Sequence, residues 1–145
     1  MATKKLTKSL KTTLYVAGNA KQDYFAVCNK EGYPVRYDYY ILFFVDTQEK
    51  AEIIAVRRAL QAVREYEFEN KIIIKEVEIL TSEKELLNFK NKKTLSSVLL
   101  DYAIEFGFNL KIKYVSPKEN FAKKYIKPAP LGFINIDKII TEPIN

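Results

Sequence analysis

The residues of this chain that could carry chemistry are mainly carboxylates, amides and lysines, because the sequence has no histidine and a single cysteine, Cys28. A catalytic thiol or serine ordinarily needs a neighbouring base such as histidine. The usual zinc sites also draw on histidine or on several cysteines. The sequence therefore argues against thiol, serine-triad and zinc chemistry. Cys28 is expected to be a small core residue. A lone cysteine also excludes an internal disulfide and favours an intracellular, reducing compartment.

Basic residues exceed acidic ones by 24 to 18, which gives a formal net charge of +6. This excess favours an anionic partner such as nucleic acid. A group of lysines gathers toward the C-terminal part of the chain: Lys111, Lys113, Lys118, Lys123, Lys124 and Lys127. Two interpretations stay open, a solvated face or a surface that contacts phosphates. Lysine binds phosphate as a point charge, so the second predicts binding that weakens with salt.

Three β-prone segments open the fold, at residues 14–17, 24–29 and 35–45, and their spacing predicts an antiparallel meander. The apolar period then changes to three and four residues, which predicts a buried helix from Gln48 to Glu65 with Thr47 as its N-cap. A strand is expected at residues 72–80.

Alternating elements follow in the second half of the chain. Helices are expected from Thr81 or Ser82 to Phe89 and over residues 95–106, where Gly107 ends the second. A strand at residues 110–115 and a short helix opened by Pro117 come next.

This order predicts one α/β domain with a five-stranded mixed sheet, three antiparallel strands followed by βα units, flanked by helices. We expect a basic leader over residues 1–12, the domain over residues 13–127, and an extended C-terminal tail over residues 128–145. No apolar run reaches the roughly 18 residues that span a membrane, so no membrane association is expected.

Four short motifs fall in this order on the expected elements. They are Ala17-Gly18-Asn19 after the first strand, Thr47-Gln48-Glu49-Lys50-Ala51-Glu52 at the first helix, Thr81-Ser82-Glu83 after the fourth strand, and Val115-Ser116-Pro117 with Asn120 near the end. With these motifs the chain resembles the type 1 ribonuclease H family, in its short branch without the histidine loop. The resemblance implies the ribonuclease H-like fold over residues 13–127.

The family cleaves the RNA strand of RNA–DNA hybrids with two magnesium ions held by four carboxylates. Carried over by the resemblance, those four positions are Ala17, Glu52, Ser82 and Lys124 in this chain, and only Glu52 is acidic. A lysine at such a position repels a divalent ion, at a cost on the order of 4 kcal/mol per unit charge at about 4 Å. The resemblance therefore predicts a catalytically degenerate member, with no metal and no cofactor. If the motifs correspond, Glu52, Ser82 and Lys124 should converge on one site.

The predicted function is a non-catalytic, ribonuclease H-like module that binds RNA, an RNA–DNA hybrid or a nucleoprotein assembly. The residues expected to contact nucleic acid are Asn19, Lys21, Thr47, Lys50, Lys118, Lys123 and Lys124. One alternative is a divergent magnesium-dependent ribonuclease whose ligands have moved to carboxylates such as Glu83 or Glu78. The other is a structural subunit that docks on a protein partner through its C-terminal tail.

Overall fold

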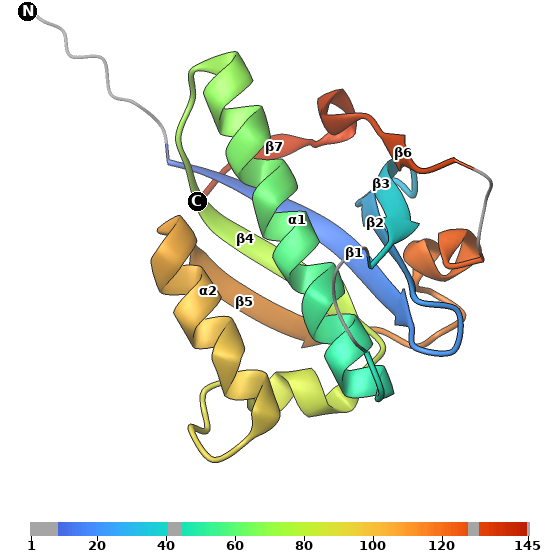
Figure 1. Ribbon diagram of the computed structural model, residues 1–145. Helices are drawn as coiled ribbons and strands as arrows, with labels where there is room; N and C mark the ends of the chain where they lie inside the picture. Colours follow the sequence, from blue (N-terminus) through green and yellow to red (C-terminus); the bar gives the residue numbers. More distant parts are fainter. Residues whose placement is uncertain (1–8, 41–44, 128–130, 145) are drawn as a thin grey trace, which may run out of the picture.

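One mixed sheet of seven strands forms the centre of the computed structural model, which describes residues 9–40, 45–127 and 131–144 (Figure 1). The strands are β1 (Leu10–Asn19), β2 (Tyr24–Asn29), β3 (Pro34–Tyr39), β4 (Ile74–Thr81), β5 (Asn109–Tyr114), β6 (Phe133–Ile134) and β7 (Thr141–Pro143). Their order is β5-β4-β1-β2-β3-β6, and β7 pairs with β1. The meander β1–β2–β3 is antiparallel, whereas β4 and β5 run parallel to β1.

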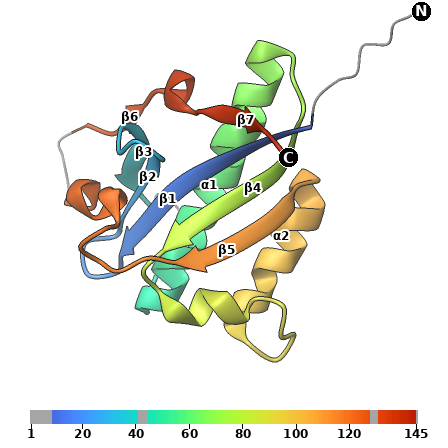
Figure 2. The same cartoon turned by 180° about the vertical axis from the view of Figure 1, so that it is seen from behind.

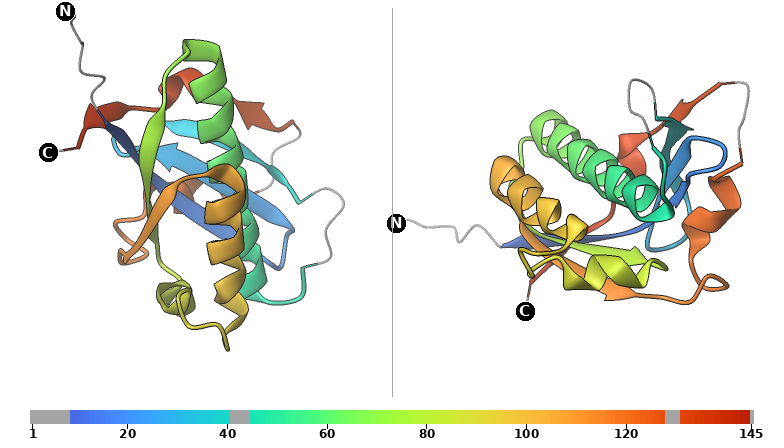
Figure 3. Two further views of the ribbon diagram at one scale, coloured as in Figure 1. Left: turned by 90° about the vertical axis from the view of Figure 1, so that its left-hand side faces the viewer. Right: turned by 60° about the horizontal axis from the view of Figure 1, so that its bottom comes forward.

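Two α-helices and four short 3₁₀ helices complete the described elements. They are α1 (Gln48–Asn70), η1 (Lys84–Asn88), η2 (Leu95–Ser97), α2 (Val98–Phe106), η3 (Phe121–Tyr125) and η4 (Ile136–Lys138). Figure 3 shows α1 and α2 side by side over the same face of the sheet. None of these helices is long and apolar enough to cross a membrane.

The predicted α/β architecture is confirmed, with some boundaries shifted. Thr47 caps α1 by accepting a hydrogen bond from the Lys50 backbone N–H, and Gly107 ends α2 in the left-handed conformation. However, α1 continues past Glu65 to Asn70, because no glycine or proline stops it before the left-handed Lys71. The helix predicted from Thr81 or Ser82 is only the 3₁₀ helix η1, in which a single residue is buried. Such tight helices are seldom longer than three or four residues.

The main core lies between the two α-helices and the sheet. On α1 the buried side chains run from Ala51 to Val63, and they pack on inward residues of β1, β4 and β5 such as Val16, Ile79 and Leu110. A smaller apolar cluster lies on the opposite face, where Ala122 of η3 packs against β1 and β2. The core therefore holds β1 between α1 on one side and η3 on the other.

The remaining part of the second face carries charged side chains. Figure 2 shows β1, β4 and β5 from this side, with the α-helices behind them. Lys113 pairs with Glu78 at 2.9 Å, and Lys111 pairs with Glu76 at 3.4 Å, each across neighbouring strands. Lys111 and Lys113 were candidates for a phosphate-contacting surface, but here their charges are balanced within the sheet.

The C-terminal segment differs from the predicted extended tail, because it joins the sheet. Its strand β6 pairs with β3, and β7 pairs antiparallel with β1 in the register Lys11↔Glu142. The Thr12 hydroxyl also donates to the Ile140 carbonyl at 2.7 Å. Thus the sheet has seven strands rather than five. The predicted basic leader overlaps β1, which begins at Leu10, and residues 1–8 lie outside the described part of the chain.

Helix α1 lies in close contact with β1 at Gly18. A Cβ atom on Gly18 would lie 2.6 Å from the backbone carbonyl of Ala51 and 2.4 Å from the Tyr40 hydroxyl. That hydroxyl donates to the Ala51 carbonyl at 3.0 Å. The Gln48 side-chain amide donates to the Gly18 carbonyl at 2.6 Å. Only glycine leaves room for this contact, which fixes the start of α1 on the end of β1.

Replacing Gly18 with alanine should therefore destabilise the protein by about 2 to 3 kcal/mol, since backbone atoms of α1 must move to make room. Urea unfolding monitored by circular dichroism measures this loss. Gly107→Ala is the matched control. A Cβ there meets only Arg64 Nη2 at 3.9 Å, and its cost is limited to the left-handed backbone, about 1 kcal/mol. Equal losses in the two variants would contradict the close approach of α1 to Gly18.

Candidate functional site

Glu52 is a buried carboxyl group with both oxygens engaged by the protein. It is 1% exposed, its Oε1 accepts a hydrogen bond from the Gly18 backbone N–H at 3.0 Å, and its Oε2 accepts one from the Thr81 hydroxyl at 3.3 Å. Burial raises the pKa of Glu52 to about 7, and the nearby charge of Lys123 together with these two hydrogen bonds opposes part of that rise. Glu52 thus ties α1 to the ends of β1 and β4.

The residues at the first and third predicted positions flank these two contacts but point elsewhere. Ala17 is fully buried and packs with Cys28 and Ala122 in the smaller cluster, on the η3 side of the sheet. The Ser82 hydroxyl donates to the Val115 carbonyl at 2.8 Å and accepts from the Asn120 amide at 3.2 Å. Three of the predicted elements therefore converge, with Glu52 reaching the neighbours of Ala17 and Ser82.

At the fourth position the prediction is Lys124, but the lysine whose charge acts on Glu52 is the neighbouring Lys123. Lys124 instead lies over the Phe121 ring at 5.5 Å and acts on Cys28, whose pKa burial raises to about 12. The expected helix from Pro117 is a turn followed by the 3₁₀ helix η3 after Asn120. Its three residues per turn rotate the side chains relative to an α-helix.

Asn120 fixes η3 in this place, a role that the sequence did not reveal. Its amide donates to the Val16 carbonyl at 3.0 Å as well as to Ser82, and its Oδ1 accepts from the Ala122 backbone N–H at 3.0 Å. The side chain is 2% exposed. These bonds join η3, which contains Lys123, to β1 and to the end of β4.

Glu83 is a further carboxyl group, and its charge acts on Glu52. Burial, a hydrogen bond with Glu85, and the negative charges of Glu85 and Glu49 raise the pKa of Glu83 to about 7. Glu78, the other candidate for a relocated ligand, pairs with Lys113 instead. Across residues 9–40, 45–127 and 131–144, no group of three or more His, Cys, Asp or Glu residues is arranged to hold a metal ion.

The side chains at the four family positions do not fit a pair of magnesium ions. Such ions need several carboxylate oxygens free to coordinate them. Both oxygens of Glu52 are held by Gly18 and Thr81, Ala17 offers no oxygen, and the Ser82 hydroxyl is bound to a carbonyl. The positive charge of Lys123 also acts on Glu52.

A basic hollow of about 430 Å³ opens beside this site. It is lined by Asn19, Lys21, Gln22, Lys123, Ile126 and Lys127. Asn19 builds its wall, because its Nδ2 donates to the Gln22 side chain at 3.0 Å and to the Ile126 carbonyl at 3.1 Å. Three lysines from the β1–β2 turn and from η3 and its C-terminal flank thus meet in one place.

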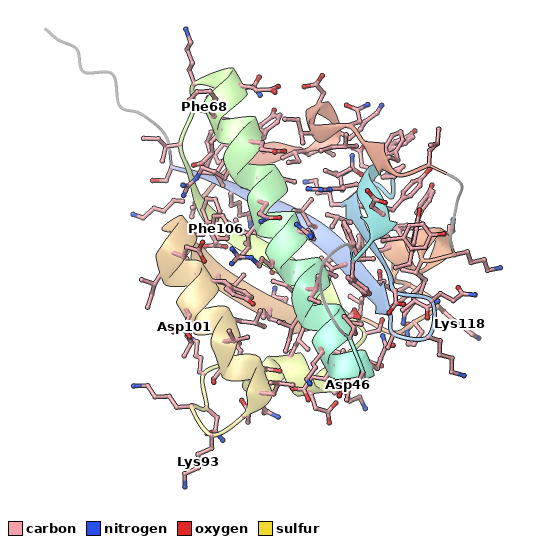
Figure 4. The ribbon with its side chains drawn as sticks, viewed as in Figure 1. Asp46, Phe68, Lys93, Asp101, Phe106 and Lys118 are labelled. Carbon is pink, nitrogen blue, oxygen red and sulfur yellow. The ribbon has the colours of Figure 1, made fainter. Side chains whose placement is uncertain are left out.

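The predicted nucleic-acid residues fall into two groups. Asn19, Lys21 and Lys123 line the basic hollow. The others lie outside it: Thr47 caps α1, Lys50 pairs with Asp46 at 2.9 Å, Lys118 lies in the turn after β5, and Lys124 covers Phe121. Figure 4 shows Asp46 at the start of α1 and Lys118 on the side of η3. Gln22 and Lys127 complete the hollow but were absent from the predicted set, although Lys127 belongs to the lysine-rich stretch.

No protein-family model and no curated protein sequence matches this chain. Its structure is similar to that of LC11-RNase H1 in complex with an RNA/DNA hybrid, with a TM-score of 0.54 and 16% sequence identity over 77% of this chain and 88% of the other. It is also similar to LC11-RNase H1 isolated from compost by a metagenomic approach, with a TM-score of 0.56 and 16% identity over 82% of this chain and 96% of the other. These likenesses show that the chain has a ribonuclease H-like fold.

Proposed function

We propose that this protein is a nucleic-acid-binding module that holds an RNA–DNA hybrid or a related RNA duplex without cleaving it. The observation that carries the proposal is the basic hollow lined by Lys21, Lys123 and Lys127, directly beside a carboxyl group that the protein has enclosed. The positive charge of Lys123 acts on Glu52, at a place where a metal-dependent nuclease needs negative charge.

The binding half of the proposal rests on the chemistry of the hollow. Ammonium groups neutralise phosphates and release condensed counterions, which makes this kind of binding sensitive to salt and weakly selective for sequence. No ion pair links Lys21, Lys123 or Lys127 to a carboxylate within the described residues, unlike Lys111 and Lys113. The structural neighbour LC11-RNase H1 has been solved with an RNA/DNA hybrid, which supports a duplex as the ligand.

The non-cleaving half rests on Glu52. Its oxygens accept hydrogen bonds from Gly18 and Thr81, so their task is to join α1, β1 and β4. Burial also raises the pKa of Glu52, which disfavours the charged form that a magnesium ion binds. We assign Glu52 a structural role for these reasons.

A divergent ribonuclease is the second candidate. Burial, together with the nearby carboxyl groups of Glu85 and Glu49, raises the pKa of Glu83 to about 7, and a group that titrates near neutral pH can act as an acid or base. The charge of Glu83 in turn acts on Glu52. The two candidates differ in one property, namely whether a bound hybrid is cut.

The double variant Lys123→Ala/Lys127→Ala should bind a short RNA–DNA hybrid more weakly and with a smaller salt dependence. The slope of log K against log salt concentration should fall in magnitude by about 2, because two phosphate contacts are lost. Fluorescence anisotropy with a labelled hybrid at several salt concentrations measures both quantities.

Lys92→Ala/Lys93→Ala is the control for the loss of two charges. These lysines are exposed in the turn between η1 and η2, where Figure 4 labels Lys93, far from the hollow. This variant should keep the original salt slope. If the two double variants lose the same affinity and slope, binding depends on net charge alone and the hollow is not the site.

Replacing Glu52 with glutamine should change how stability depends on pH. The folded pKa lies near 7 against an ordinary value of 4.5, so the folded state keeps a proton that the unfolded state has released. The free energy of unfolding should therefore fall as pH rises from about 4.5 to about 7, by an amount on the order of 3 kcal/mol. Glutamine stays neutral, so Glu52→Gln should equal the original protein near pH 4.5 and exceed its stability at pH 8.

Urea unfolding at a series of pH values tests this expectation, with the exposed Glu119→Gln as the control. Parallel pH profiles for the original protein and Glu52→Gln would mean that Glu52 is not enclosed as described. The comparison isolates Glu52 because Glu83 and the other acids are present in both proteins.

A further inference from the structure

A second hollow, of about 720 Å³, is bordered mainly by acidic side chains, in contrast to the basic hollow. Phe68 of α1, Ile134 of β6 and Ile136 of η4 form its apolar part, and Glu65, Glu69 and Asp137 stand around them. It separates the outer face of the C-terminal half of α1 from the β6–η4 segment. We call it the acidic groove.

Two of the three apolar side chains of the acidic groove, Phe68 and Ile134, lie outside the core, whereas Ile136 packs partly against it. On α1 the last buried residue is Val63, yet the helix continues to Asn70 and presents Phe68 with 83% of its surface exposed (Figure 4). Across the groove, Ile134 is 56% exposed and also borders a neighbouring hollow that contains the exposed Leu131. Large exposed apolar groups gathered around one hollow are typical of a contact surface for a partner.

The charges of the acidic groove are free to act on a partner. Within the described residues, Glu65, Glu69 and Asp137 form no ion pair. Arg64 also borders the groove, but its guanidinium group is engaged by the Glu67 carboxylate and the Phe106 carbonyl. The groove therefore offers an apolar floor and a negative rim on a chain whose net charge is +6.

We propose that the acidic groove binds a short segment of a partner protein that carries a large apolar side chain flanked by lysine or arginine. The negative rim opposes phosphate groups, which excludes nucleic acid and anionic lipid as occupants. A symmetric dimer through this surface would set the same carboxylates of two copies against one another, since such an interface places one patch on itself. In a peptide with basic flanks, the apolar side chain would contact the apolar floor of the groove and the basic residues would lie against the carboxylates of its rim.

A random 12-residue peptide library, displayed on phage and panned against the full chain, tests the proposal. The expected result is a family of peptides with one large apolar residue between basic residues. A synthetic peptide of that family should lose about tenfold or more in affinity for Phe68→Ser, as expected for a central apolar anchor. It should also bind Glu69→Lys more weakly, as measured by fluorescence anisotropy.

The matched controls are Ile104→Ser and Asp101→Lys on α2, which remove an apolar group that is 79% exposed and reverse an exposed charge away from the groove. Both should keep the affinity of the original protein. The proposal is overturned if no such family is enriched, or if the enriched peptides bind Phe68→Ser as tightly as the original. Sedimentation that shows a dimer broken by Phe68→Ser would also overturn it, because the occupant would then be a second copy.

Discussion

The contact between Gly18 and the first turns of α1 is the constraint on which this structure depends. At Gly18 the strand has no side chain, so α1 can approach closely enough for Glu52 to accept the Gly18 N–H and for Gln48 to donate to the Gly18 carbonyl. Both backbone groups are thereby satisfied by side chains of one helix, in a place where unpaired backbone groups are costly. Thr81 adds β4 to the same carboxyl group. The carboxyl group of Glu52 thus joins α1, β1 and β4.

The same contact limits the chemistry that Glu52 can perform. An acid that holds the fold together is withdrawn from solvent, and its raised pKa favours the neutral form. Around it, Asn120 anchors η3, whose Lys123 acts on Glu52 through its charge and lines the basic hollow with Lys21 and Lys127. The negative counterpart lies along the outer face of α1, where Phe68 and Glu69 border the acidic groove. We infer that phosphate groups bind at the basic hollow and that a protein segment binds at the acidic groove.

The sequence predicted those features that depend on local chemistry. Thr47 and Gly107 mark helix ends through their own side-chain and backbone properties, and the spacing of apolar residues located α1. The pairing of strands that are far apart in the sequence was harder to predict. Nothing local in Thr141–Pro143 indicates that it lies beside β1, because that register is set by a partner far away in the chain. Likewise Lys123 and Lys124 are adjacent in sequence, and no local pattern indicates that the charge of Lys123 acts on Glu52 while Lys124 lies over the Phe121 ring.

A single assay can show both whether the chain binds a duplex and whether it cuts that duplex. An end-labelled RNA–DNA hybrid is incubated with excess protein in magnesium or manganese, and the bound fraction and the strand lengths are read from the same samples. We expect the hybrid to be bound and to stay intact, both with the original protein and with Glu52→Gln. Cleavage that requires the metal and disappears in Glu52→Gln would contradict this expectation. Glu52 would then be a metal ligand in catalysis rather than a structural residue.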